Sequence, residues 1–394
     1  MRDVIEDELR GPSVLKDAGK LSFDWLPDDL PGREPELRSL AQLFRPLLQG
    51  ATAQHALLTG PVGVGKTAVA KYFCRSFQRV GAKQAPPLEV QWVAINCRKR
   101  STTSGVLIGV LDHLFGRFPD RGFSVDEMLK SMHQKLEPSQ TKLLVVLDEA
   151  DVLLRRSGPD LVYLLTRFNE EARHAQHGVS LLLVSQQDVR PLLDEASAST
   201  LKLTHHLPLQ RYSQAQLQVI ARQRVEVAFH PGVVAEEVEE LVADIAAEQG
   251  SARRVLELLE GAARAADTER AKVVSAEHVR AAKADVESVV TESKLRDLDK
   301  HHKLALLGIA RALRGGDAYA VTGRAEENYQ VACEEHGEEP RGHTQFWTYI
   351  KDLQASGLVD AKRSGKGVAG TTTIISLHDI PARVLEERLL RLLG

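Results

Sequence analysis

The chain has 394 residues, of which 43% are hydrophobic and 27% charged, and its formal net charge is −3. This length and composition predict a globular protein of two or three domains, and no apolar run is long enough to span a membrane. The small negative charge gives no overall signal of nucleic-acid binding, so any such site must be local. The three cysteines are far apart, which argues against a disulfide framework or a zinc site and favours a reducing cytoplasm.

The N-terminal part of the chain leads to a glycine-rich loop. Residues 36–48 carry apolar side chains at helical spacing, and residues 56–59 form a short apolar run that predicts a buried strand. The segment from Gly60 to Thr67 then reads G-x-x-x-x-G-K-T, the pattern of a phosphate-binding loop, and helix-forming residues follow it. Strand, glycine-rich loop and helix is the context that this motif requires.

The glycine-rich loop predicts binding of a nucleoside triphosphate. Its glycines allow backbone N–H groups to point at phosphate oxygens, and the following helix adds the positive end of its dipole. Lys66 would reach the β- and γ-phosphates, and the Thr67 hydroxyl would bind Mg²⁺. The residues expected to hold the nucleotide are Gly60, Pro61, Val62, Gly63, Val64, Gly65, Lys66, Thr67 and Ala68.

The segments around this loop alternate between strands and helices. Residues 90–96 and 179–185 predict strands, and residues 101–136 predict two helices joined by the breaker-rich segment 118–123. Together with the phosphate-binding loop, this alternation predicts a parallel sheet covered by helices on both faces. The pattern over residues 212–284 is helical without strands and indicates a separate helical domain.

An acidic pair follows another predicted strand. Residues 142–147 are mostly aliphatic and end in Asp148 and Glu149. This is the Walker B pattern, a buried parallel strand whose carboxyl end opens onto a site. Asp148 would hold Mg²⁺, directly or through water, and Glu149 would orient and polarise the attacking water.

The last quarter of the chain predicts a winged helix. Three amphipathic helices, at residues 304–313, 325–336 and 344–356, precede strand-like runs at 358–363 and 371–377, with a glycine-rich turn between the runs. A winged helix places its third helix in the major groove of DNA and its hairpin along the backbone. The DNA-contact candidates in this part are Arg341, Thr344, Gln345, Thr348, Lys362, Arg363 and Lys366.

Two further features of the sequence bear on DNA binding and on metal binding. Glutamates at 334–339 crowd the second helix, so a winged helix that binds protein partners instead of DNA is the alternative. The histidine pairs at 205–206 and 301–302 are expected on solvated faces and not at a metal, because the sequence suggests no third ligand.

Taken together, these motifs resemble one family. The Leu30–Glu34 segment, the phosphate-binding loop, the LLVVLDEAD run, a GSARR segment at 250–254 and the C-terminal winged helix are similar to the archaeal origin-recognition initiators of the AAA+ ATPases. The resemblance implies an α/β fold with an AAA+ P-loop NTPase core at 1–207, a helical lid domain at 208–290 and a winged-helix DNA-binding domain at 291–394.

The resemblance also implies a mode of action. ATP or ADP with Mg²⁺ would sit between core and lid, and Arg253 would read the γ-phosphate as the sensor arginine of the lid. Arg117 and Arg121, near Pro119, match an initiator-specific insertion that contacts DNA. The partners implied are double-stranded origin DNA, the replicative helicase and other initiator subunits. The implied location is the cytoplasm, in association with the nucleoid. The alternative is a nucleotide-controlled regulator of transcription or signalling.

Two departures from the family pattern bear on catalysis. The first sensor, usually an asparagine, is replaced by Gln187, whose side chain is one methylene longer. The segment after Asp194, which usually carries an arginine that acts across a subunit boundary, has no arginine over residues 195–200. Such an arginine can raise the rate by several orders of magnitude, so we expect weak, slow ATP hydrolysis unless Arg190 or Arg211 replaces it. The catalytic candidates are Glu149, Lys66, Gln187 and Arg253.

Overall fold

The chain forms two compact units in a computed structural model. The model describes residues 11–51, 53–168, 177–201, 205–287, 295, 298–363, 373–377 and 380–393. One unit, the core unit, holds Leu26–Tyr212 and Gly250–Ala252. The other, the C-terminal unit, holds Met1–Trp25, Ser213–Gln249 and Arg253–Gly394.

The core unit is built on a five-stranded parallel sheet with the order β2-β3-β4-β1-β5. The side chains of its three central strands are almost all buried, as expected for a parallel sheet covered on both faces. The strands are β1 (Ala56–Thr59), β2 (Val90–Asn96), β3 (Lys142–Asp148), β4 (Gly178–Ser185) and β5 (His206–Pro208). The first four agree with the predicted strands, whereas β5 was not predicted.

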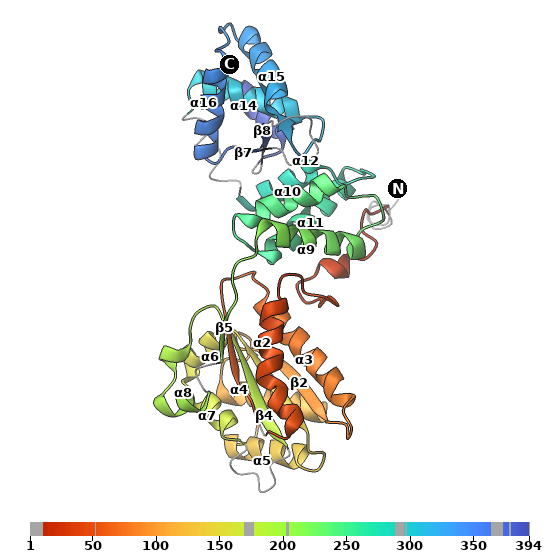
Figure 1. Cartoon of the computed structure of the whole chain (residues 1–394), viewed down its shortest axis with the longest axis vertical. Helices are drawn as coiled ribbons and strands as arrows, with labels where there is room; N and C mark the ends of the chain where they lie inside the picture. Colours follow the sequence, from red (N-terminus) through yellow and green to blue (C-terminus); the bar gives the residue numbers. More distant parts are fainter. Residues whose placement is uncertain are drawn as a thin grey trace. The chain divides into compact units, whose positions relative to one another are not determined.

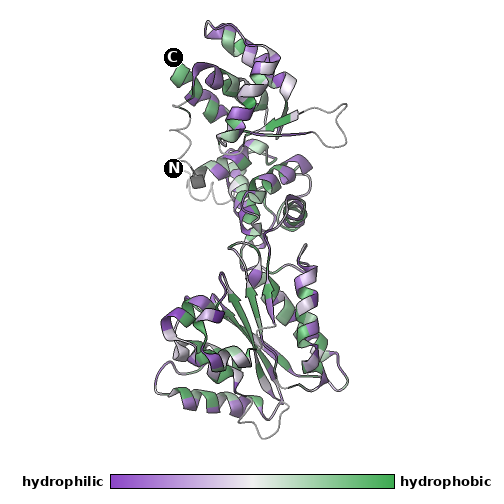
Figure 2. Cartoon of the chain, turned by 60° about the vertical axis from the view of Figure 1, so that its left-hand side comes forward, coloured by the Kyte–Doolittle hydropathy of each residue, from purple (hydrophilic) through white to green (hydrophobic). Residues whose placement is uncertain are grey.

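Helices cover both faces of this sheet (Figure 1). Side chains of β3 point alternately to the two faces of the sheet. Leu143, Val145 and Leu147 pack against one set of helices. Leu144 and Val146 pack against the other. The first set comprises α4 (Thr103–Phe115), α5 (Val125–Leu136), α6 (Ala150–Ser157) and α7 (Asp160–Thr166), and the second comprises α2 (Glu34–Phe44) and α3 (Lys66–Ala82). Figure 2 shows the hydrophobic strands between these layers.

The ends of the core helices follow from local sequence. Ser124 begins α5 with a capping box, in which it exchanges hydrogen bonds with Glu127. Gly116 ends α4 with a positive φ of 79°. The predicted break between the two helices is therefore confirmed. The helix expected over residues 36–48 instead stops at Phe44 and continues as a 3₁₀ helix over Arg45–Gln49, where Pro46 lacks the N–H that an α-helix would use.

The C-terminal unit begins with a helical part. Its helices are α9 (Gln214–Ala228), α10 (Glu236–Ala247), α11 (Ala252–Thr268) and α12 (Ala276–Glu287). The segment around the short helix η1 (Ala18–Leu21) packs on them, since the backbone N–H groups of Lys16 and Asp17 donate to the carbonyl of Ala228. Near the same place, the Arg224 guanidinium lies over the Trp25 ring at 4.5 Å.

The rest of the C-terminal unit has the winged-helix order. Its elements are α14 (Lys300–Leu313), β6 (Ala320–Val321), α15 (Thr322–Glu335), α16 (His343–Ala355), β7 (Asp360–Arg363), β8 (Thr373–Ser376) and α17 (Ala382–Leu393). The sheet is antiparallel with the order β6-β8-β7. Helices α14 and α15 pack closely because Gly308 has no side chain: a Cβ there would lie 2.6 Å from the Tyr329 nitrogen.

The expectation that the histidine pairs lie on solvated faces was wrong. His206 lies in β5, and its Nε2 is 2.7 Å from the Thr59 hydroxyl. His301 is half-buried, with Nδ1 3.0 Å from the Tyr329 hydroxyl. Within the described residues, no group of histidine, cysteine and carboxylate side chains is arranged to hold a metal ion, and no helix is long and apolar enough to cross a membrane.

Candidate functional site

The phosphate-binding loop joins β1 to α3 and depends on three glycines with positive φ. Gly60, Gly63 and Gly65 have φ values of 147°, 81° and 82°, which side-chain-bearing residues rarely adopt. Gly60 is restricted further, since a Cβ there would lie 2.6 Å from the Leu209 carbonyl oxygen. Gly65 caps α3, so the free N–H groups of the first helical turn follow the loop directly. This arrangement suits an anion such as a phosphate chain.

Lys66 lies inside the curve of the loop. Its ammonium group donates hydrogen bonds to the carbonyl oxygens of Gly60 at 2.7 Å and Pro61 at 2.6 Å. Burial lowers its pKa, and the nearby carboxylates of Asp148, Asp151 and Glu149 oppose that shift. A partly desolvated ammonium at the start of a helix attracts phosphate oxygens more strongly than one in open water.

Thr67 and Asp148 meet at the edge of the sheet. The Thr67 hydroxyl donates to the Asp148 carboxylate at 2.9 Å, although 81 residues separate them. Parallel pairing of β3 with β4 and of β4 with β1 brings their carboxyl ends to the same edge. A hydroxyl and a carboxylate are oxygen ligands of the kind that Mg²⁺ prefers, so these residues fit the metal expected from the sequence. Asp151 adds a buried carboxylate oxygen without a hydrogen-bond partner.

Glu149 stands next to Asp148 in an unusual backbone conformation. Its φ is 56°, and it caps the start of α6. Its carboxylate forms an ion pair with Arg98, a residue that the sequence analysis did not select. The pairing follows from register, because Asn96 of β2 lies opposite Asp148 of β3 and Arg98 comes two residues later. The sequence signal that could have pointed to Arg98 is its position just after β2, the strand that pairs with the Walker B strand β3.

Gln187 follows β4 at the position expected for the first sensor. Its side chain is exposed, and its Oε1 accepts a hydrogen bond from Arg155 at 3.2 Å. Arg190, one of the two possible replacements for the absent arginine, is held by Asp188 through hydrogen bonds of 2.9 and 2.7 Å from its Nε. The segment without arginine forms the short helix α8 (Glu195–Thr200). The catalytic roles of these residues stay predictions.

The Leu30–Glu34 segment contributes a buried arginine near the loop. Arg33 is 3% exposed and donates to the carbonyl of Gln210 at 2.7 Å. Its guanidinium lies 3.8 Å from the centre of the Tyr212 ring. The Tyr212 hydroxyl, in turn, would lie 3.0 Å from a Cβ at Gly65. Arg33 therefore contacts Tyr212, whose hydroxyl lies next to the phosphate-binding loop.

Arg253 belongs to the C-terminal unit, whereas its neighbour Ala252 belongs to the core unit. Within the core unit, the Ala252 N–H donates to the Gly63 carbonyl at 3.0 Å, so Ala252 lies at the phosphate-binding loop. Within its own unit, Arg253 lies over the Phe23 ring at 4.5 Å and 3.5 Å from the Glu257 carboxylate. Its role in reading the γ-phosphate stays a prediction.

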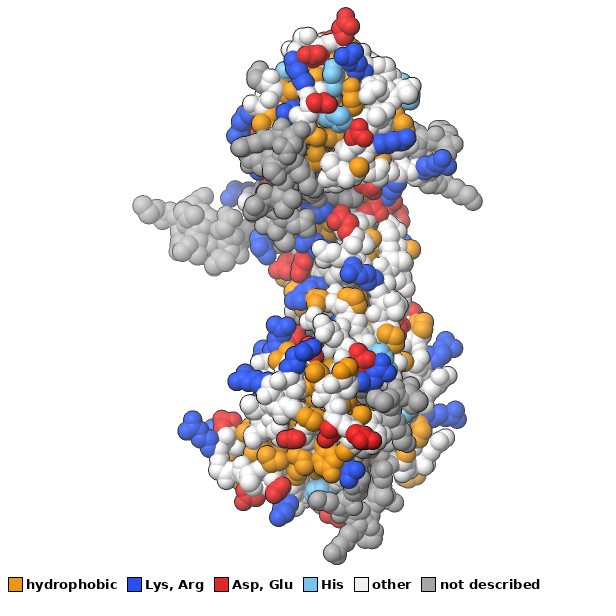
Figure 3. All heavy atoms as spheres, turned by 90° about the vertical axis from the view of Figure 1, so that its left-hand side faces the viewer, with side chains coloured by type: hydrophobic (Ala, Val, Ile, Leu, Met, Phe, Trp, Pro, Cys, Tyr) orange, Lys and Arg blue, Asp and Glu red, His pale blue; other side chains and the backbone are white. Residues whose placement is uncertain are grey.

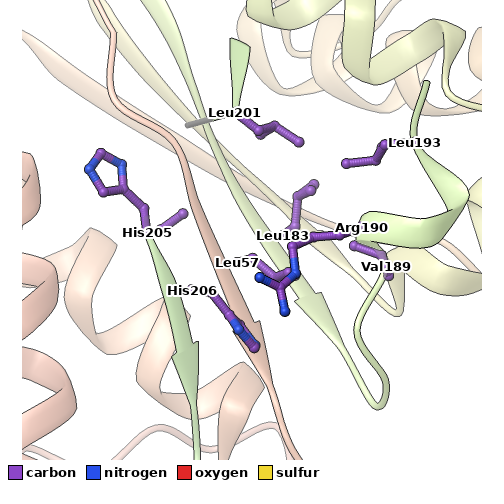
Figure 4. A pocket seen from close by; sticks show the side chains of 9 residues that line it. Leu57, Leu183, Val189, Arg190, Leu193, Leu201, His205 and His206 are labelled. Carbon is purple, nitrogen blue, oxygen red and sulfur yellow. The ribbon is translucent and has the colours of Figure 1, made fainter. Parts of the chain in front are cut away.

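A small cavity of about 20 Å³ lies elsewhere in the core unit (Figure 4). It is bordered by β1, β4 and β5, and most of its lining is apolar, with Arg190, His205 and His206 as polar exceptions. None of the phosphate-loop residues from Gly60 to Thr67 lines it. The cavity is therefore distinct from the predicted nucleotide site.

The connection between α4 and α5 combines aromatic and basic side chains. The ring of Phe118 lies 6.0 Å from that of Phe115 and 4.8 Å from that of Phe123, and Arg117 and Arg121 of the same connection are exposed. Exposed arginines and aromatic rings within one short connection suit a nucleic acid. On the face shown in Figure 3, basic and acidic side chains are otherwise interspersed, in keeping with the net charge of −3.

Helix α16 presents a polar face. Phe346, Ile350 and Leu353 are buried, whereas the predicted contacts Thr344, Gln345 and Thr348, together with Arg341 before the helix, are exposed. Of the predicted hairpin contacts, Arg363 is exposed and Lys366 lies outside the described residues. Lys362 has an environment that the sequence did not predict, because its ammonium group donates to Asp244 and Glu240 of α10.

Three segments match known protein families. Residues 49–193 match the family described as "AAA domain", residues 218–284 "Cdc6 AAA+ ATPase-type lid domain", and residues 293–387 "CDC6, C terminal winged helix domain". Over 389 residues the chain is 31% identical to "ORC1-type DNA replication protein 2" of Sulfurisphaera tokodaii, covering 96% of this chain and 92% of that protein. The chain belongs to the ORC1-type family of DNA replication proteins.

Solved structures of related proteins have the same architecture. Cdc6p of Pyrobaculum aerophilum has a TM-score of 0.82 at 27% identity, covering 97% of this chain and 99% of its own. Aeropyrum pernix ORC1 in complex with DNA has a TM-score of 0.62 at 33% identity, covering 96% and 97%. Aeropyrum pernix ORC2 in its ADP form has a TM-score of 0.64 at 27% identity, covering 96% and 98%. The AAA+ core, lid and winged helix of this ORC1-type protein are those expected from its sequence.

Proposed function

We propose that this ORC1-type protein is a replication initiator that binds duplex origin DNA and uses bound nucleotide as a switch. The observation that carries the DNA-binding part is the exposed polar face of α16, with Thr344, Gln345 and Thr348. Hydroxyl and amide side chains of this kind hydrogen-bond to base edges and phosphates. Arg341 and Arg363 would add contacts with the phosphate backbone.

A second DNA contact is proposed for the connection between α4 and α5. Arg117 and Arg121 would contact phosphates there, so that the core unit and the winged helix both bind DNA. The structure of Aeropyrum pernix ORC1 in complex with DNA, at 33% identity over nearly the whole chain, supports DNA binding by this protein. Lys366, which lies outside the described residues, is proposed as a further phosphate contact.

The nucleotide part of the proposal rests on the loop geometry. ATP or ADP would lie on the loop with its phosphates at Lys66 and Mg²⁺ at Thr67 and Asp148, and the ADP form of Aeropyrum pernix ORC2 supports nucleotide binding. Hydrolysis would be slow, since Glu149 is paired with Arg98 and α8 carries no arginine. The protein would then act as a switch that, with other initiator subunits, helps to load the replicative helicase at the nucleoid.

A footprint on the DNA of the source genome tests this function. Protection should map to a replication origin, should need a functional nucleotide site, and should weaken with Thr344→Ala and Gln345→Ala together. Protection that maps to promoters instead would favour a transcription regulator. If no fragment is protected with ATP or ADP present, the DNA-binding proposal fails.

A further inference from the structure

Lys362 in the hairpin of the winged helix is held by acidic side chains of the lid. Its ammonium group donates to the Asp244 carboxylate at 2.6 Å and to the Glu240 carboxylate at 3.0 Å, and both acceptors lie on α10. The Tyr319 hydroxyl donates to the same Asp244 oxygen at 2.6 Å. The Lys362 ammonium also lies 4.4 Å from the centre of the Tyr319 ring. We name Glu240 and Asp244 the acidic pair.

The acidic pair holds Lys362 firmly, but the Lys362 ammonium remains accessible enough for another anion to replace the pair. The side chain of Lys362 is 30% exposed, that of Glu240 36% and that of Asp244 10%. Burial acts to lower the pKa of Lys362, but the hydrogen bonds to Asp244 and Glu240 outweigh burial and raise it. Lys362 is therefore a charged group with a partly accessible partner, and a phosphate can offer it the same type of oxygen ligand.

A second contact between lid and winged helix is of a different kind. Arg280 of α12 is fully buried and donates to the backbone carbonyls of Leu377, Asp317 and Ala318 at 2.9, 3.1 and 2.9 Å. The Glu277 carboxylate accepts from Arg280 at 2.5 Å and from the Ala382 N–H at 2.7 Å. This buried contact holds the two parts together whether or not Lys362 is released.

Strand β7 divides its two basic residues between two environments. Side chains alternate along a strand, and here Lys362 contacts α10 whereas its neighbour Arg363 is exposed. The hairpin thus offers one basic residue to a phosphate directly, while the other is already bound within the chain.

We propose that the acidic pair occupies Lys362 in place of DNA phosphate, so that the lid restrains the affinity of the winged helix for DNA. This inference rests on the proposed DNA binding of the winged helix. DNA binding would draw Lys362 away from α10 towards a phosphate, and the lid would lose an ion pair. The acidic pair of the lid and a DNA phosphate would in this way compete for one cation of the hairpin.

A double-mutant cycle tests the competition with a fixed fluorescein-labelled duplex. The variants are Glu240→Gln with Asp244→Asn, Lys362→Met, and the three changes combined. Removal of the acidic pair should tighten binding by about 3- to 10-fold and should steepen the salt dependence by about one phosphate contact. The gain should vanish in the Lys362→Met background. Glu236→Gln with Glu237→Gln, on the same helix, is the control for general charge and should give a smaller gain.

A measurement without DNA tests the contact itself. Acetylation of Lys362 by an amine reagent should be slow relative to the exposed Lys351 and should become faster when the acidic pair is neutralised. Cooperative thermal unfolding and ATP binding should be retained in all variants, which shows that they fold.

Two results would overturn the inference: an equal gain in affinity with and without Lys362, or weaker binding after the acidic pair is neutralised. If the unaltered protein binds no duplex at all, the proposed function fails, and the inference with it. Binding without the coupling defeats the inference alone.

Discussion

Replacing Arg98 by alanine removes the cation that pairs with Glu149, the residue expected to polarise the attacking water. The carboxylate cannot serve both partners well, because an oxygen held in an ion pair with Arg98 is less available to accept a hydrogen bond from the attacking water. We therefore expect Arg98→Ala to increase the rate of ATP hydrolysis, whereas the loss of most residues near an active site lowers it.

The exposure of the two side chains sets the size of the increase. Arg98 is 63% exposed and Glu149 28%, so their ion pair belongs to the solvent-screened class. Such pairs contribute about 0.2–1 kcal/mol, which corresponds to a ~1.4- to 5-fold shift between paired and unpaired Glu149. If paired Glu149 is inactive, removing Arg98 raises the active fraction from 1/(1 + K) to 1, where K is this paired-to-unpaired ratio, so the rate should rise by about 2- to 6-fold.

Single-turnover hydrolysis of radiolabelled ATP is the suitable assay, because release of ADP does not limit it. Lys99→Ala, which removes a positive charge one residue further along the chain, is the matched control and should leave the rate unchanged. An unchanged or lower rate for Arg98→Ala, with ATP binding intact, would show that Arg98 does not restrain Glu149. An equal increase with Lys99→Ala would show that the loss of any nearby positive charge, and not of the ion pair, raises the rate.

Three further results are expected. Glu149→Gln should abolish hydrolysis but retain ATP, as measured by filter binding; an unaltered rate would refute the role of this carboxylate. Arg363→Ala with Lys366→Ala should weaken DNA binding on all sequences and reduce the salt slope by ~1.8; unchanged binding would remove the hairpin from the interface. Arg280→Met should lower the free energy of unfolding by about 3–5 kcal/mol in urea, because it leaves three carbonyls and Glu277 without their buried partner; a loss below ~1 kcal/mol would mean that water replaces it.

The elements that sequence predicted well are those with a strong local signal. The strands at 56–59, 90–96 and 142–147 are uninterrupted or nearly uninterrupted apolar runs, and the structure has a strand at each. Strand β6 consists of two residues, and its pairing with β8 comes from contacts between distant segments. No local pattern predicts an element of that length.

The sequence by itself determined the phosphate-binding loop and the acidic end of β3. Gly60, Gly63 and Gly65 specify a backbone path that other residues do not take, and Asp148 follows a run of buried aliphatic residues, so these features are local. Only the tertiary structure decided which partner each charge would meet. Arg98 reaches Glu149 because β2 and β3 pair in register, and Lys362 reaches α10 across 118 residues of chain. The energy of a charge depends on the distance and burial of its neighbours, which folding sets and sequence spacing does not show.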